Sequence, residues 1–205
     1  MKEAGTHALA VGLPGQVNFA FDTRTAALAY LWKGPFLDAQ GTWFMRFVPD
    51  AEPLGDPGHV LPPGSLLAEL SAVNNAWPGD DAEPPGNRLA GEFGGYRLDE
   101  SGVPEFLYRS AGCDVIERLT VTDAGTLRRR LTLTSRKPRQ VWLRAIVGAD
   151  LVHSKMECRT GSGLTVRLDG PLADEGYVVG QDNQSEWRIS LEIDGTDTLE
   201  IEYQW

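Results

Sequence analysis

Apolar and polar residues alternate one by one along most of this sequence, and this pattern constrains the fold more than any other feature. In residues 186–193 and again in 199–205, the apolar side chains occupy every second position. Successive side chains of a β-strand point to opposite faces of a sheet, so each segment predicts a strand with one buried and one solvated face. Residues 194–197, which include Gly195, predict a turn between them. Together they predict an antiparallel hairpin.

The same alternation predicts strands throughout the chain, at residues 16–22, 26–33, 43–48, 96–99, 105–110, 113–122, 126–134, 139–147, 164–168 and 177–180. No window keeps apolar residues at helical spacing over three turns, and the short segment 65–72 fits a helix or a strand. The 23 glycines and 13 prolines follow no collagen period and indicate many turns between short strands. The sequence therefore predicts an all-β fold with little helix: an antiparallel two-sheet β-sandwich, jelly-roll-like or supersandwich.

One stretch of the chain, residues 49–86, differs from the rest. It holds eight of the 13 prolines and seven acidic residues. The segment before it is too short to bury a core by itself, so we expect a single domain over residues 1–205. In that domain 49–86 is a long Pro-rich acidic excursion, either wrapped over an edge of the sandwich or directly functional.

Charge and targeting signals bear on partners and location. The chain has 19 basic and 29 acidic residues and a formal net charge of −10 at pH 7. Such a surface repels polyanions, so we expect no nucleic-acid partner. Residues 125–148 contain seven basic residues and no carboxylate, which indicates a solvated strand face or a site for an anion or an acidic partner. We expect no membrane span and find no signal peptide, so the sequence alone does not fix the location.

Motifs for nucleophilic, metal or cofactor chemistry are not evident in the sequence. There is no G-x-S-x-G segment, and the chain has three histidines. His153, Met156 and Cys158 are soft-metal ligand types, but on a strand His153 faces away from Met156 and Cys158. Cys113 and Cys158 lie outside any CxxC motif and either pair with each other or stay free. We therefore expect no metal and no cofactor.

A group of aromatic and polar side chains provides the candidate site. Aromatic rings can stack on the apolar face of a sugar, while carboxylates and guanidinium groups hydrogen-bond its hydroxyls. The candidate ligand-binding residues are Trp32, Asp38, Trp43, Arg46, Tyr96, Arg97 and Tyr108. The alternative interpretation is that these rings fill the core. For an enzyme, Asp38 and Asp99 are the candidate acid/base pair, with Arg46 and Arg97 positioning the substrate.

Several sequence phrases are more specific than composition: AVGLPGQVNFAFD (10–22), LAYLWKGPFLD (28–38), GTW (41–43), EPLG (52–55), GGYRLD (94–99) and GVPEFLY (102–108). Together they resemble an uncharacterised β-rich module of large secreted bacterial proteins that also carry quinoprotein-like propeller and c-type cytochrome domains. The resemblance extends to about Val121. It implies a β-sandwich, a periplasmic or secreted location, and association with redox or carbohydrate-degrading machinery. It supplies no catalytic residues.

These observations favour a non-catalytic accessory β-sandwich module that binds carbohydrate or docks partner redox domains. Two alternatives stay open. One is a carbohydrate-active enzyme, a hydrolase or epimerase, that uses paired carboxylates on the sandwich. The other is a structural or assembly domain that exposes an apolar sheet edge and has no small ligand.

Overall fold

The computed structural model describes residues 1–2, 4–44, 50–78, 91–170, 173–181 and 184–205. Its elements are β-strands apart from a one-turn 3-10 helix, η1 (Pro14–Gln16), and one short helix, α1 (Gln40–Phe44). Every strand pairing in this part of the chain is antiparallel. The predicted all-β, antiparallel, sandwich-like fold is confirmed. Within the described ranges, no helix is long and apolar enough to cross a membrane.

The first sheet, called here the N-terminal sheet, has the strand order β1–β2–β3–β6. The bounds of these strands are Ala8–Leu13, Val17–Asp22, Ala27–Lys33 and His59–Val60. Strand β2 is buried along its whole length because both of its faces are covered. Phe19 and Phe21 pack toward the second sheet, whereas Ala20 packs on the outer face with Ala4 and Trp32.

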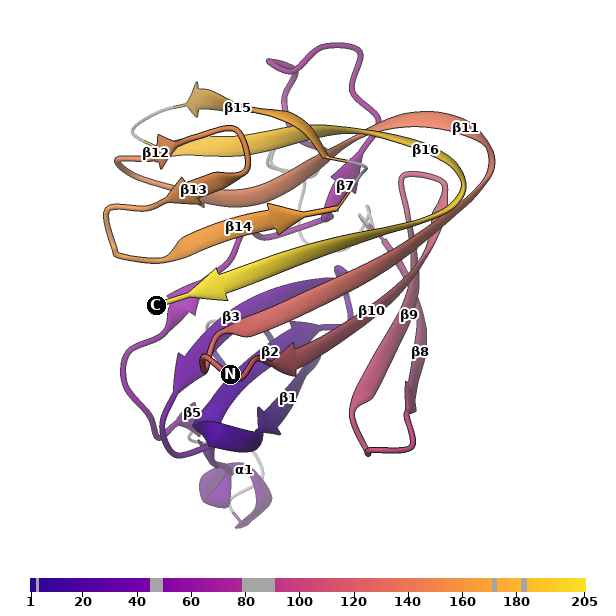
Figure 1. The fold of residues 1–205 in the computed structure, drawn as a ribbon. Helices are drawn as coiled ribbons and strands as arrows, with labels where there is room; N and C mark the ends of the chain where they lie inside the picture. The colour runs from indigo at the N-terminus through magenta and orange to yellow at the C-terminus, as the bar shows by residue number, and fades with distance from the viewer. Residues whose placement is uncertain (3, 45–49, 79–90, 171–172, 182–183) are drawn as a thin grey trace.

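The second sheet, called here the main sheet, has the order β12–β13–β14–β16–β11–β10–β9–β8, with β15 added on β16 and β7 added on β11. The bounds are Leu67–Ala68 (β7), Glu92–Leu98 (β8), Pro104–Ser110 (β9), Cys113–Val121 (β10), Leu127–Gly148 (β11), Val152–His153 (β12), Glu157–Arg159 (β13), Thr165–Asp169 (β14), Ala173–Gln181 (β15) and Gln184–Gln204 (β16). The two longest strands, β11 and β16, bend together and run through both halves of the molecule (Figure 1).

The predicted hairpin turn at residues 194–197 is wrong, because β16 continues through them beside β11. Ser135 of β11 pairs with Gly195, and pairing resumes at Arg139 after β11 has advanced four residues and β16 only two. The additional residues form a β-bulge, which bends both strands instead of reversing the chain. Pro138 lies in this bulge, where its missing N–H removes no ladder hydrogen bond.

Aromatic packing joins the two sheets. The ring of Phe21 stacks on that of Phe106 from β9, with centroids 4.2 Å apart, and Phe19 meets Phe106 edge-on at 6.1 Å. One buried apolar cluster extends from these residues to Leu199 and Tyr203 of β16. Figure 1 shows the N-terminal sheet lying against the lower parts of β10, β11 and β16. The core therefore sits between the sheets, as alternate inward side chains require.

Residues 50–78, the described part of the predicted excursion, are called here the strap. The strap contributes three short strands: β5 (Glu52–Pro53) pairs with β4 (Leu37–Asp38), β6 pairs with β3, and β7 pairs with β11. Segment 65–72, predicted as helix or strand, therefore contains a strand. At Gly58 the strap lies directly on β3: its N–H donates to the Tyr30 hydroxyl at 2.9 Å, and a Cβ atom there would overlap the carbonyl oxygen of Leu31.

The predicted strand at residues 43–48 is wrong where the structure describes it, because its first two residues belong to helix α1. Asp38 lies two residues before this helix, and its Oδ1 accepts a hydrogen bond from the backbone N–H of Gln40 at 2.9 Å. An acidic side chain placed just before a helix satisfies an N–H group that has no partner within the helix. Residues 45–49 lie outside the described part of the chain.

Candidate functional site

Two of the sequence-derived candidates, Trp32 and Tyr108, lie in the interior. Trp32 is fully buried in β3, and its Nε1 donates to the carbonyl oxygen of Phe36 at 2.9 Å. Tyr108 is buried in β9, and its hydroxyl donates to Oε2 of Glu117 at 2.7 Å. Neither ring is available to stack on a ligand in this structure. For these two residues the core interpretation describes the geometry.

Tyr96 and Arg97 lie instead on β8, at an edge of the main sheet. Tyr96 is 55% exposed, and its ring is 6.4 Å from that of Phe106. Arg97 is exposed and pairs with Glu105 on β9 at 2.7 Å. Neither residue lines the hollows described below. The structure therefore does not gather the aromatic candidates into one cleft.

The two candidate carboxylates have local structural contacts. Asp38 accepts the N–H of Gln40 at the start of α1, as described above. Asp99 follows β8: its Oδ1 accepts the backbone N–H groups of Ser101 and Val103 at 2.8 and 2.9 Å, and its Oδ2 accepts Nε of Arg118 at 2.8 Å. Oδ1 of Asp99 thus holds the β8–β9 turn, and Oδ2 joins this turn to Arg118 of β10.

Two further candidates, Trp43 and Arg46, give no information on the site. Trp43 belongs to α1, but its side chain lies outside what the structure describes, and so does the whole of Arg46.

Replacing Asp99 with Asn is expected to lower the free energy of unfolding at neutral pH, and this loss is expected to shrink in acid. The hydrogen bond from Arg118, helped by the backbone N–H groups, holds the pKa of Asp99 below its usual value. A carboxyl group whose pKa is lower in the folded chain stabilises the fold above the unfolded pKa, and this contribution disappears as pH falls through the folded pKa. Asn keeps an acceptor for the turn but removes the charge. Urea denaturation of both proteins at neutral and acidic pH tests this, and an equal difference at both would contradict it.

The first open hollow lies at one end of the N-terminal sheet and has a volume of about 520 Å³. It is called here the Phe36 hollow, and its lining includes Gly12, Gly15, Gln16, Asn18, Gly34 and Phe36. The Phe36 ring is 42% exposed and stacks on Trp32, with centroids 6.0 Å apart and planes 14° apart. Trp32 stacks in turn on Tyr30 at 5.7 Å. An aromatic ladder therefore runs from the interior to the hollow and ends in an exposed ring.

Local backbone chemistry explains how this ring comes to the surface. Gly34 ends β3 with a φ of 97°, a left-handed value that favours glycine, and so directs the chain away from the sheet. Gly12 leaves room for the ring, because a Cβ atom there would lie 3.2 Å from Phe36 and 3.3 Å from Oδ1 of Asn18. The amide nitrogen of Asn18 donates to the carbonyl oxygen of Gly34 at 3.0 Å, which fixes the side chain. Asn18 is only 2% exposed, and its Oδ1 has no hydrogen-bond partner in the described part of the chain.

The second open hollow lies between β6 and the ends of β11 and β13 and has a volume of about 570 Å³. It is called here the Asp150 groove, and its lining includes Gly58, His59, Ile146, Asp150, Thr160 and Ser162. Burial lowers the pKa of His59, so its imidazole is uncharged at neutral pH. The hydroxyls of Thr160 and Ser162 lie 2.8 Å apart. His59 and Asp150 are the two ionisable side chains among the residues that line this groove.

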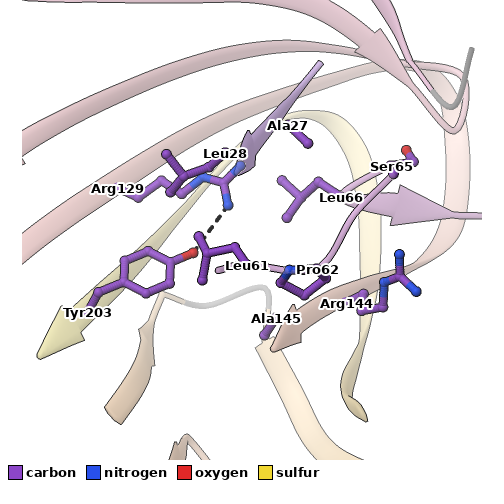
Figure 2. Close-up of a pocket in the computed structure, with 11 residues that line it drawn as sticks. Ala27, Leu28, Leu61, Pro62, Ser65, Leu66, Arg129, Arg144, Ala145 and Tyr203 are labelled. Carbon is purple, nitrogen blue, oxygen red and sulfur yellow. Dashed lines mark hydrogen bonds between the residues drawn. The ribbon is translucent and has the colours of Figure 1, made fainter. Parts of the chain in front are cut away.

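A third cavity lies between buried residues of the core and has a volume of only about 10 Å³ (Figure 2). Such a space holds about one water molecule. Arg129 and Arg144 both line it, and Arg129 directs its guanidinium group to the hydroxyl of Tyr203 at 3.2 Å. This cavity is too small for an organic ligand. It belongs to the buried polar network of the core.

Phe36 and Asn18 are not among the candidate ligand-binding residues predicted from the sequence. Phe36 carries a recognisable signal, since it follows Gly34 and Pro35 at the end of an alternating segment, where a ring leaves the sheet. Asn18 carries none, because its position depends on β2 and β3 pairing so that Gly34 comes beside it. The Asp150 groove likewise joins residues far apart in sequence.

No family model matches this chain, and a search of curated proteins finds no match. Among solved structures, the chain is similar to the 4-alpha-glucanotransferase from Thermococcus litoralis, with 10% sequence identity and a TM-score of 0.47. The match covers 97% of this chain and 37% of that enzyme. A similarity this low carries no conclusion on function. The implied association with secreted redox proteins stays a prediction.

Proposed function

We propose that this chain is a non-catalytic β-sandwich module that binds carbohydrate at the Phe36 hollow. The observation that carries this proposal is the exposed Phe36 ring beside the amide oxygen of Asn18. An aromatic face is complementary to the apolar face of a sugar ring, and an amide oxygen accepts a hydrogen bond from a sugar hydroxyl. The hollow volume of about 520 Å³ falls in the range typical of small-ligand sites.

The charge of the hollow supports a neutral ligand. The eight described residues that line it are all uncharged: Gly12, Leu13, Gly15, Gln16, Asn18, Gly34, Pro35 and Phe36. A phosphorylated or acidic ligand would find no cation among these eight residues, whereas a neutral polyhydroxylated ring needs none. These features together favour a neutral saccharide over an ionic ligand.

The contacts of the candidate carboxylates favour binding over hydrolysis. Glycoside hydrolysis by paired acids requires two carboxyl groups that flank one bond of the substrate. Asp99 instead accepts hydrogen bonds at both oxygens from its own turn and from Arg118, and Asp38 caps helix α1. Neither residue lines the Phe36 hollow. The sequence also predicted that an accessory module could dock partner redox domains. The contacts of Asp38 and Asp99 do not bear on that role.

Replacing Phe36 with Ala is expected to weaken saccharide binding by about tenfold, since one aromatic contact contributes roughly 1.4 kcal/mol. The experiment is a glycan-array screen of the wild type, followed by calorimetric titration of the best ligand against each variant. The matched control is Phe44→Ala, because Phe44 is 81% exposed but does not line the hollow. Equal weakening in both variants, or no binding to any glycan, would reject the proposal.

A further inference from the structure

The Asp150 groove differs from the Phe36 hollow in that it presents a carboxylate held in place by the backbone. Asp150 has a φ of 53°, a left-handed value that is uncommon outside glycine but tolerated by Asp and Asn. The neighbouring loop supports this turn, because the N–H of Gly161 donates to the carbonyl oxygen of Ala149 at 3.2 Å. A Cβ atom on Gly161 would lie 3.2 Å from Oδ2 of Asp150. The carboxylate therefore lies against the Gly161 backbone on one wall of the groove.

The carboxylate of Asp150 has no ion-pair partner among the described residues. On the main sheet, Glu157 pairs with Arg167 and Glu105 pairs with Arg97, each at 2.7 Å, whereas the exposed Glu92, Asp169 and Glu192 have no ion-pair partner in the described part of the chain. Asp150 differs from these three because it lines a groove. A groove carboxylate without such a partner offers a site for a cation of the ligand.

The other described residues that line the groove add no positive charge to it. His59 is uncharged at neutral pH, and its ring meets the edge of the Trp205 ring with centroids 6.1 Å apart. The nearby ammonium group of Lys33 lies over the face of Trp205 at 4.6 Å and donates to that residue's carbonyl oxygen at 2.9 Å. The residues lining the groove thus carry one negative charge, together with the hydroxyls of Thr160 and Ser162.

We propose that the Asp150 groove binds an amino sugar, with the protonated amine of the sugar on the Asp150 carboxylate and a hydroxyl of the sugar toward the exposed Ser162. The groove volume of about 570 Å³ is ample for one sugar ring. The side chain of Val60, which is 60% exposed and lines the groove, suits the apolar face of such a ring. This second site is separate from the Phe36 hollow, since the two share no lining residue.

The test is a titration of the folded protein with glucosamine, glucose and N-acetylglucosamine. Binding is measured from the changes in the amide NMR chemical shifts of Gly148 and Gly161, which line the groove. The wild type is expected to bind glucosamine about tenfold more tightly than the two uncharged sugars, as one charge-assisted hydrogen bond would provide. Asp150→Asn is expected to remove this preference. Asn keeps the shape and tolerates the left-handed backbone, and an unchanged melting temperature would verify that the fold is retained.

The matched control is Asp56→Asn, which makes the same charge change on the strap outside the groove lining and is expected to leave the preference intact. Equal binding of all three sugars, no binding of glucosamine, or a preference that survives Asp150→Asn would overturn the proposal. Loss of glucosamine binding in Phe36→Ala would place the amine in the other hollow and would also overturn it. Failure of saccharide binding at the Phe36 hollow alone would leave these expectations unchanged.

Discussion

Replacing Glu117 with Ala is expected to lower the free energy of unfolding by about 3–5 kcal/mol. Glu117 is fully buried in β10, and its Oε2 accepts hydrogen bonds from the Tyr108 hydroxyl at 2.7 Å and from Arg129 at 2.8 Å. The variant leaves the buried guanidinium of Arg129 without a carboxylate, and the hydroxyl of Tyr203 at 3.2 Å cannot neutralise it. An uncompensated buried charge is far more costly than the net contribution of the intact pair.

Urea denaturation at neutral pH measures this loss, and two comparisons isolate its cause. Arg97→Ala removes an exposed pair, with side chains 61% and 22% exposed, and is expected to cost at most about 1 kcal/mol. The double variant Glu117→Leu with Arg129→Met is expected to recover much of the loss. The pair is imperfect, since Oε1 of Glu117 and Nε of Arg129 have no hydrogen-bond partner among the described residues. A Glu117→Ala cost no greater than that of Arg97→Ala would contradict the prediction, because it would show that Arg129 is not left as an uncompensated buried charge.

This pair also shows what the sequence pattern can and cannot predict. Alternation predicts that Arg129 shares a face with Leu127 and Leu131, and it does lie on that buried face. The partner cannot be predicted in the same way, because it depends on the register between strands. In that register Arg129 lies opposite Leu119, which brings Glu117 into reach as a diagonal neighbour.

The errors in the predicted fold have the same origin. Residues 194–197 contain turn-forming residues, but both flanking segments of β16 pair with the single long strand β11. Tertiary pairing therefore prevails over local turn propensity. At α1 two local patterns disagree. Asp38 can accept a hydrogen bond from the first turn of a helix, whereas the alternation in residues 43–48 favours a strand, and the structure has the helix. Strand positions follow from a period of two, but the connections between strands do not.

The candidate site is harder to predict than the fold, because composition identifies aromatic residues and not their exposure. Trp32 and Phe36 are four residues apart and belong to the same aromatic ladder, yet the first is fully buried and the second lies at the surface. What separates them is the change of direction at Gly34 and the covering of Trp32 by the N-terminal segment that includes Ala4. Both depend on tertiary packing.

Replacing Trp77 with Ala is expected to cost about 3–5 kcal/mol and to release the strap from the main sheet. The Trp77 ring is fully buried, and the guanidinium groups of Arg144 and Arg188 lie over it at 4.8 and 5.2 Å. Glu186 lies between these arginines and accepts from them at 3.2 and 2.6 Å. Nε1 of Trp77 donates to the carbonyl oxygen of Ser65 at 3.0 Å. The ring therefore holds the strap against two buried cations.

The conservative variant Trp77→Phe separates these contributions. It keeps an aromatic face for both arginines but removes the indole N–H, so we expect a smaller cost of about 1–2 kcal/mol. Hydrogen exchange of the Leu67 and Ala68 amides reports directly on the strap, because these residues pair with β11. In Trp77→Ala these amides should exchange faster than those of β10, since only the strap loses its contact with the sheet. If they remain as protected as in the wild type, the strap is held mainly by its backbone pairing and by the hydrogen bonds that Arg188 donates to the carbonyl oxygens of Val73 and Asn75.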